Sequence, residues 1–171
     1  MGLQIGSIEI NEEEKYRLIS DFTYDWEEWR GPSNELLYVS PACERVTGYP
    51  AEAFLSDPDF IFSIIHPQDV PKFIQHRSEL NCSQREESQL DFRIIHKSGE
   101  ERWINHYCLP IFHQSGAWIG RRQSNRDITY RKRTEAQLFQ TQQQLEIILS
   151  HIDTIVIGLN KDGQLVYANK A

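Results

Sequence analysis

Apolar and polar residues alternate in the second half of the chain. Leu90, Phe92 and Ile94 are separated by charged residues, which is the period-two pattern of a strand with one buried face. Gly-containing turn sequences follow, and each leads into another extended stretch. The pattern predicts three consecutive antiparallel strands, over residues 90–94, 102–112 and 118–127.

A second extended region lies nearer the N-terminus. Aromatic residues alternate there, so Phe22, Tyr24 and Trp26 are expected on one side of a strand that covers residues 22–30. The turn sequence Gly-Pro-Ser-Asn comes next. We therefore expect the returning strand of a hairpin over residues 36–40.

Short helices are expected between these two groups of strands. Ser40 can cap a helix that has Pro41 at its first position and that ends at Gly48. Prolines interrupt residues 50–66, which favours several short helices, and a clearer helix is expected over 67–80. Two strands, short helices and three further strands predict an α+β fold, with one five-stranded antiparallel sheet and the helices on one side of it.

Both ends of the chain predict additional helices. Residues 7–20 form an amphipathic pattern in which Asn11 can cap a helix and Glu14 has capping-box spacing. Residues 129–152 repeat apolar residues or Thr every three or four positions, as in the seam of a coiled coil. The seam consists of Thr134, Leu138, Thr141, Leu145, Ile148 and Ile152. Beyond it, residues 154–171 return to a strand–turn–strand pattern.

Charge and cysteine content narrow the classes of function. The formal charge is −7, so we expect no nucleic-acid partner. Three cysteines without CxxC or CxxH spacing argue against disulfides and against a metal site, and favour a reducing, cytoplasmic location.

No apolar stretch approaches the length of a membrane span, so no direct membrane contact is expected in this segment. Without a Ser-His-Asp arrangement or a phosphate loop, we expect no catalysis by this chain.

Six short segments carry a family resemblance when their order and spacing are taken together. They are Tyr38–Tyr49, Ile65–Asp69, Phe92–Gly99, Arg102–Ile104, Leu109–Ile111 and Arg126–Thr129. The chain resembles a PAS domain with its C-terminal PAC segment over about residues 21–130. PAS domains are sensory modules of bacterial signalling proteins.

The resemblance implies a division into four parts and a set of partners. Residues 1–20 would be an N-terminal amphipathic helix, 21–129 the PAS/PAC sensor domain, 130–152 a signalling linker helix, and 153–171 the truncated first hairpin of a second PAS domain. A homodimer would form through the N-terminal and linker helices. The parent protein would be a histidine kinase or a diguanylate cyclase.

A pocket between the sheet and the helices is also implied by the resemblance. Alternation alone leaves the orientation of residues 102–112 open, but a match to flavin-binding relatives turns Ile104, His106 and Cys108 inward. The candidate pocket residues are Phe92, Ile94, Ile104, His106, Cys108, Gln123 and Asn125. Their polar groups can serve a small-molecule ligand, or they can satisfy one another in a closed core.

The sequence identifies no cofactor. The Asn-Cys-Arg-Phe-Leu element of flavin photosensors is absent, and Cys43 is expected to be a small packed thiol. His76 lies on the helix that supplies the axial ligand in haem-binding members, but this helix is otherwise polar and we expect His76 to be exposed. Because His76 lies on this helix, a haem-based gas or redox sensor stays an alternative.

Asp127 and Thr129 join the last strand to the long helix. We expect Asp127 to form a hydrogen bond or an ion pair near the start of the helix, and Thr129 to cap it. A signal at the sheet would then move the helix and pass to an output domain beyond it. The alternative is a ligand-free structural dimerisation spacer with a filled core.

Overall fold

The structure is a computed structural model that describes residues 3–5, 8–82, 86–150 and 157–168. The chain divides into two compact units, Met1–Thr129 and Tyr130–Ala171, and each is described by itself. The predicted division of the chain into a sensor domain, a linker helix and a second hairpin stays a prediction.

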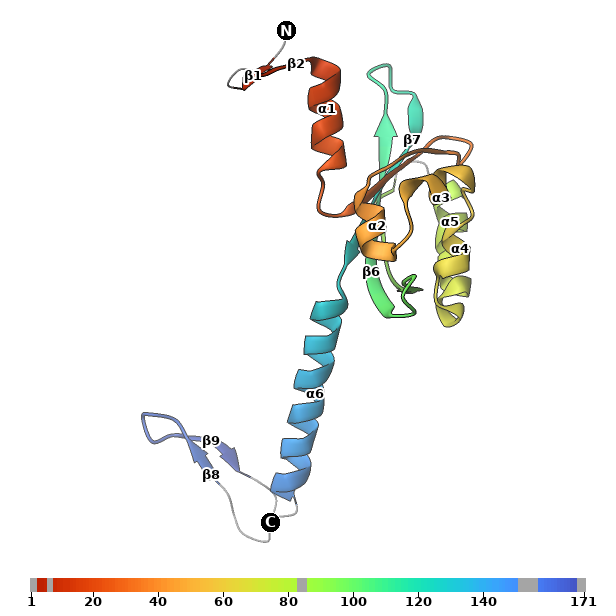
Figure 1. The fold of residues 1–171 in the computed structure, drawn as a ribbon. Coiled ribbons are helices and arrows are strands. Elements are labelled where there is room, and N and C mark those ends of the chain that lie inside the picture. Colours follow the sequence, from red (N-terminus) through yellow and green to blue (C-terminus); the bar gives the residue numbers. More distant parts are fainter. Residues whose placement is uncertain (1–2, 6–7, 83–85, 151–156, 169–171) are drawn as a thin grey trace. The chain divides into compact units, whose positions relative to one another are not determined.

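The first unit contains a small N-terminal hairpin, a helix, and a sheet whose strands are interrupted by short helices (Figure 1). Its elements are β1 (Leu3–Ile5), β2 (Ile8–Ile10), α1 (Glu12–Asp21), β3 (Trp26–Arg30), β4 (Leu36–Val39), α2 (Ala42–Thr47), α3 (Ala51–Ser56), α4 (Ile61–Ile64), the 3₁₀ helix η1 (Pro67–Asp69), α5 (Val70–Cys82), β5 (Ser88–Ile95), β6 (Glu101–Phe112) and β7 (Trp118–Asp127).

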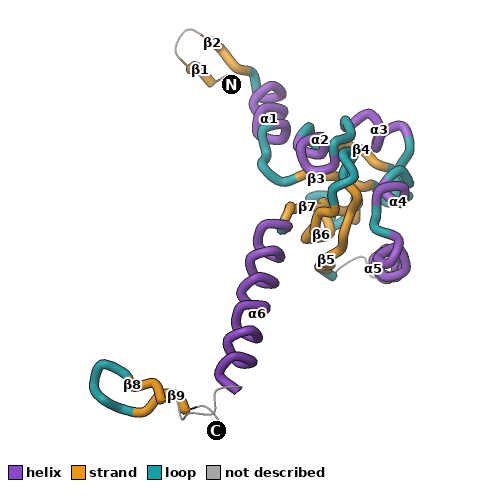
Figure 2. The backbone as a smooth tube through the Cα atoms, turned by 60° about the horizontal axis from the view of Figure 1, so that its bottom comes forward, coloured by secondary structure: helices purple, strands orange, loops and turns teal. Residues whose placement is uncertain are grey.

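The main sheet has five antiparallel strands in the order β4-β3-β7-β6-β5. The predicted fold class is therefore confirmed. The central strand β7 pairs with β3 on one side and β6 on the other, so Asn125 lies opposite Trp26 and also opposite His106. Helices α2 to α5 gather on one side of the sheet, as Figures 1 and 2 show.

The core lies between this face of the sheet and the short helices. Phe92 and Trp26 are fully buried, and the Trp26 ring packs on Phe54 with 5.0 Å between ring centroids. Full burial of one such side chain contributes about 2–3 kcal/mol. Other members of the core are Val39, Cys43, Val46, Ile61, Ile64, Ile65, Phe73, Ile94 and Ile104.

Gly48 ends α2, as its sequence position predicts. It has a φ of 82°, and a Cβ atom there would lie 2.6 Å from Cβ of Lys97 in the β5–β6 turn. Glycine is therefore required both by the left-handed backbone and by the approach of the turn. This contact holds the end of α2 against the sheet, beside the core.

The predicted N-terminal helix over 7–20 begins later than expected. Ile8 and Ile10 belong to β2, because an apolar–polar–apolar sequence suits a strand better than a first helical turn. The helix starts after Asn11, whose Oδ1 accepts a hydrogen bond from the Glu14 amide at 2.8 Å. The predicted cap is confirmed, while the predicted start is wrong.

The strand predicted over 22–30 is shorter, and its aromatic residues do not share one side. Trp26 is buried, but Phe22 is 82% exposed and Tyr24 is 76% exposed. Phe22 is the C-terminal cap of α1, and the residues between it and Trp26 form a turn, so β3 begins only at Trp26. The aromatic alternation therefore extends in the sequence into a helix end and a turn.

Ser40 does not cap α2. Its hydroxyl accepts a hydrogen bond from the Glu27 amide at 2.9 Å, on the opposite strand of the β3–β4 hairpin. A buried amide close by competes for the hydroxyl that would otherwise reach the helix. Helix α2 begins two residues later, at Ala42.

The second unit contains most of helix α6 (Thr129–Ser150) and a hairpin of β8 (Ile157–Leu159) and β9 (Leu165–Ala168). The seam residues Leu138, Leu145 and Ile148 are exposed on α6, so a dimer through this helix stays a prediction. Ile152 and the outer residues of the predicted hairpin, 154–156 and 169–171, lie outside the described residues. Among the described helices, none combines the length and apolar character that crossing a membrane requires.

Candidate functional site

The predicted pocket residues all point to the helix-covered face of the sheet. Strands β5, β6 and β7 place them there by alternation, and every one of them is buried. They are Phe92, Ile94, Ile104, His106, Cys108, Gln123 and Asn125. The orientation expected from the resemblance is the one observed, whereas a ligand-binding role for these residues stays a prediction.

The polar side chains of this face bind one another. His106 and Asn125 lie opposite each other on β6 and β7, and the His106 Nδ1–H donates to Asn125 Oδ1 at 2.6 Å. The thiol of Cys108, two residues along β6, lies 2.9 Å from His106 Nε2. Polar groups removed from water need such partners, because an unsatisfied one costs about 1–3 kcal/mol.

Little space remains beside this cluster. The free volume lined by Trp26, Phe73, Phe92, His106 and Asn125 is about 10 Å³, which is at the lower limit for one water molecule. The Trp26 Nε1–H, which is buried here, has no hydrogen-bond partner among the described residues. In this arrangement the core beside the cluster can thus accept at most a very small guest.

His76 is buried, which corrects the expectation that it is exposed. It lies on α5 with a 5% exposed fraction, and its Nε2 is 3.6 Å from the Cys108 thiol. A signal for this was present in the sequence. Phe73 lies three residues earlier and therefore on the same helix face, and Phe73 packs against Phe92 of the sheet.

Two charged residues of the inner face were missed by sequence reasoning. Glu28 and Arg30 are buried on β3, and Arg30 Nε lies 3.3 Å from both Glu28 Oε2 and Gln123 Oε1. Both residues follow Trp26 at spacings of two and four, so strand alternation would have found them. They extend the polar cluster along the sheet towards the β3–β4 turn.

Burial dominates the electrostatics of this face. It lowers the pKa of His106 to about 4 and also lowers the pKa of His76, while it raises the pKa of the Cys108 thiol to about 12. Burial also raises the pKa of Glu28, and the nearby Arg30 opposes that shift. The imidazoles and the thiol are therefore neutral near pH 7.

Asp127 and Thr129 form a junction that links β7 and β6 to the first residue of α6. Asp127 Oδ1 accepts from the Thr129 amide at 2.9 Å, and Thr129 Oγ1 accepts from the Trp103 amide of β6 at 2.9 Å. The Ile128 amide donates to the Trp103 carbonyl at 2.8 Å. Asp127 thus provides the hydrogen bond that was expected from Thr129, because the Thr129 hydroxyl is already bound to the sheet.

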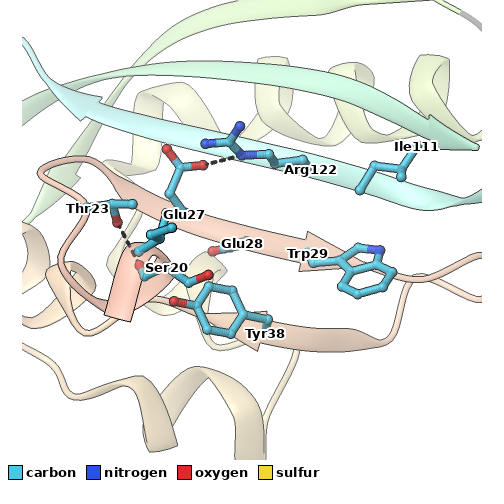
Figure 3. A pocket seen from close by; sticks show the side chains of 9 residues that line it. Ser20, Thr23, Glu27, Glu28, Trp29, Tyr38, Ile111 and Arg122 are labelled. Carbon is cyan, nitrogen blue, oxygen red and sulfur yellow. Dashed lines mark hydrogen bonds and ion pairs between the residues drawn. The ribbon is translucent and has the colours of Figure 1, made fainter. Parts of the chain in front are cut away.

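The opposite face of the sheet carries a larger and more open pocket, shown in Figure 3. Its volume is about 340 Å³, and α1, β3, β4, β6 and β7 contribute to its walls. The lining residues are Ile19, Ser20, Thr23, Glu27, Glu28, Trp29, Tyr38, Ile111 and Arg122. This volume lies within the range of small-molecule sites. No pattern in the sequence predicts a pocket on this face.

Most polar groups of the outer pocket already have partners. Arg122 Nε lies 2.9 Å from Glu27 Oε2, the pair joined by a dashed line in Figure 3, and Ser124 Oγ donates to Glu27 Oε1 at 2.9 Å. The Tyr38 hydroxyl donates to Asp21 at the end of α1. A ligand here would have to compete with these bonds.

The structure is thus a small α+β domain in which short helices and one face of a five-stranded antiparallel sheet enclose the core. The family described as PAS fold matches residues 36–120, and the chain contains a PAS domain. No curated protein matches the chain.

Solved structures of low sequence identity share this fold. A PAS domain from Colwellia psychrerythraea is 21% identical with a TM-score of 0.56, covering 70% of this chain and 99% of that one. A sensory box histidine kinase/response regulator from Burkholderia thailandensis is 23% identical with a TM-score of 0.54, covering 77% and 98%. The N-terminal domain of a diguanylate cyclase with PAS/PAC sensor from Marinobacter aquaeolei is 19% identical with a TM-score of 0.54, covering 63% and 98%.

Proposed function

We propose that the PAS domain is a cytoplasmic sensory and dimerisation module, which couples a small-molecule or redox signal in its inner core to an output domain through α6. The output would be a histidine kinase or a diguanylate cyclase. That part of the proposal rests on the family resemblance, because the similar solved structures share too little sequence to indicate more than the fold. The homodimer would use the N-terminal helix and the exposed seam of α6.

The observation that carries the proposal is the short path along β7 from the core to α6. Asn125 binds His106 inside the core, and Asp127 binds the first residue of α6 two positions further on. A strand transmits a shift along its length because its backbone is held by both neighbours. A change at His106 would therefore reach Thr129 through a single rigid segment.

A signal can act here only by favouring one arrangement of the core over another. The small free volume and the unpartnered Trp26 Nε1–H suit a small polar guest or a change within the cluster itself. The filled core also supports a second candidate, a ligand-free dimerisation spacer. The two candidates differ in whether a perturbation of the cluster reaches the junction.

Amide hydrogen exchange tests this difference without knowledge of the ligand. Replacing Asn125 by Leu should raise exchange at the Ile128 and Thr129 amides by about tenfold or more, because their hydrogen bonds depend on the position of β7. The matched control is Asn105→Leu on the outer face of β6, which should leave both amides unchanged. Equal exchange in the two variants would support the spacer.

The junction itself is tested in the parent protein. Asp127→Ala removes the acceptor of the Thr129 amide and should abolish signal-dependent output, while basal output persists. Asp59→Ala removes a carboxylate that is exposed and paired with Arg77, so it should change nothing. Unchanged signal dependence in Asp127→Ala would contradict transmission through this junction.

A further inference from the structure

Three side chains that bind metal ions meet inside the core. They are His76 of α5 and His106 and Cys108 of β6, and their ligand atoms all lie within 4.8 Å of one another. Each is buried, although two of them are more than 30 positions apart in the sequence. Local sequence spacing therefore could not reveal this set, and it departs from the expectation that the chain has no metal site.

The three donor atoms are directed at one another. Both imidazoles turn Nε2 towards the Cys108 thiol, at 3.6 Å from His76 and 2.9 Å from His106. Around a tetrahedral zinc ion, sulfur and nitrogen ligands lie about 3.5 Å apart. The distance from His76 Nε2 to the Cys108 sulfur already has this length. The distance from His106 Nε2 to the same sulfur would have to increase by about half an ångström.

The other ring nitrogen of each histidine is held by a neighbouring strand. His106 Nδ1–H donates to Asn125 Oδ1 of β7 at 2.6 Å, which leaves the lone pair on Nε2. His76 Nδ1 lies 3.3 Å from the Ser88 hydroxyl of β5. Histidine ligands in metal sites are oriented in this way, with the second nitrogen bound to a carbonyl, carboxylate or water.

We propose that His76, His106 and Cys108 form a binding site for one transition-metal ion of the zinc and copper class. Two imidazoles and a thiolate suit these ions, and three protein ligands leave a fourth position for water or an external ligand. On binding, the Cys108 S–H bond breaks, sulfur donates its electron pair to the ion, and the proton leaves to solvent. The site does not depend on signal transmission through β7.

An ordinary hydrogen bond from the Cys108 thiol to His106 Nε2 would explain the 2.9 Å contact without a metal. The two interpretations differ in what Co²⁺ does when it is added to the metal-free protein. With a site, one equivalent of Co²⁺ should produce a thiolate-to-cobalt charge-transfer absorption, and Zn²⁺ should displace it. With only a hydrogen bond, no saturable absorption should appear.

The experiment uses the full chain with Cys82 replaced by Ser, so that two cysteines remain. Cys108→Ser should remove the absorption, whereas the matched control Cys43→Ser should retain it, because Cys43 is equally buried but its thiol lies near the Tyr49 carbonyl. His76→Gln and His106→Gln should each weaken Co²⁺ binding by tenfold or more. The exposed His113 serves as the matched histidine control, and His113→Gln should bind normally.

Asn125 provides a further test of the metal site, because it positions His106 without being a ligand itself. Asn125→Leu keeps all three ligands but removes the acceptor that orients His106, so affinity should fall by about 10- to 100-fold at unchanged one-to-one stoichiometry. Should Cys108→Ser fail to fold, proton release decides the matter, since each Zn²⁺ should release about one proton from the unaltered protein. An absorption that survives Cys108→Ser, or Zn²⁺ that releases no proton, would overturn the proposal.

Discussion

The two faces of strand β6 use polar residues in opposite ways. Towards the helices, His106 and Cys108 are buried and bind each other. Towards the outer face, Asn105 and Tyr107 remain partly exposed and bind the side chains of Asp91 and Glu87. The polar inner side chains depend on internal partners, while the outer ones can also use water. An inner polar residue is therefore the more informative one about function.

The faces also differ in their free space. The inner face leaves about 10 Å³ beside its polar cluster, whereas the outer face carries a pocket of about 340 Å³ whose polar groups are engaged in ion pairs and hydrogen bonds. A large opening and a specific polar arrangement thus occur on different sides of one sheet. A choice of functional site by pocket size alone would therefore favour the outer face and overlook the polar cluster of the inner face.

The largest expected effect on stability comes from removing a large side chain from the inner face. Phe92→Ala should lower the free energy of unfolding by about 3–5 kcal/mol, because it removes a fully buried ring and leaves a cavity. The control is Phe112→Ala at the exposed end of β6, with a loss below about 1 kcal/mol. Urea unfolding of both variants gives the comparison, and similar losses would show that the burial of Phe92 does not determine the cost.

A smaller effect is expected from the inner polar pair. Asn125→Leu leaves the His106 Nδ1–H buried without an acceptor and should cost about 2 kcal/mol. Asn105→Leu makes the same change on the outer face, where water can replace the lost bond, and should cost less than about 1 kcal/mol. The difference in urea midpoint between the two variants measures the contrast, which equal midpoints would remove.

The ion pair between Asp69 and Arg93 tests charge at the sheet edge. Asp69 accepts from Arg93 Nε at 2.9 Å and from its amide at 2.8 Å, and these bonds lower the Asp69 pKa to about 2. The pair therefore stabilises the fold above the unfolded-state pKa of about 4, and this contribution is lost as the pH falls from about 4 to 2.

The expected size of this acid loss is about 1–2 kcal/mol after allowance for screening. Unfolding free energy measured between pH 5 and pH 2 should fall less steeply for Asp69→Asn than for the unaltered protein. The exposed ion pair of Asp59 with Arg77 supplies the control, and Asp59→Asn should keep the original slope. An unchanged slope in Asp69→Asn would exclude the assignment.

The smallest effect is expected at the outer pocket. Arg122 is more than half exposed, so its pair with Glu27 should contribute about 0.2–1 kcal/mol and less at high salt. The inner counterpart Arg30 is buried beside Glu28, and Arg30→Gln should cost about 3 kcal/mol or more. Chemical unfolding of Arg122→Gln and Arg30→Gln at two salt concentrations checks both values. A large, salt-independent loss in Arg122→Gln would contradict the contrast.

Strand alternation predicted which residues of β5, β6 and β7 share a face, and the match to flavin-binding relatives was needed to predict which face of β6 and β7 turns to the helices. Alternation succeeded because a half-buried strand must repeat with period two, whatever its partners are. The same rule failed for Phe22 and Tyr24, since alternation does not show that the preceding helix and its turn extend to the start of β3. The position of Gly48 was predictable because its backbone conformation excludes most other residues.

The partners inside the core were not predictable from the sequence. His76 reaches Cys108 from a different element, and the distance between them depends on how α5 packs on the sheet. The small free volume of the core depends on how Phe73 and Phe92 pack beside His106. Alternation specifies a side chain's direction, while partners and free volume follow only from the assembled tertiary structure.

The strand order of the main sheet has a consequence for how the domain folds during synthesis. The central strand β7 is the last of the five strands of this sheet to be synthesised, and its contact between Arg122 and Glu27 of β3 spans 95 positions. Closing so long a loop precedes the contacts that stabilise it, which slows folding. The β3–β4 hairpin therefore gains its second sheet partner only after β7 has emerged from the ribosome. Acquisition of structure is expected as one late event rather than as gradual growth from the N-terminus.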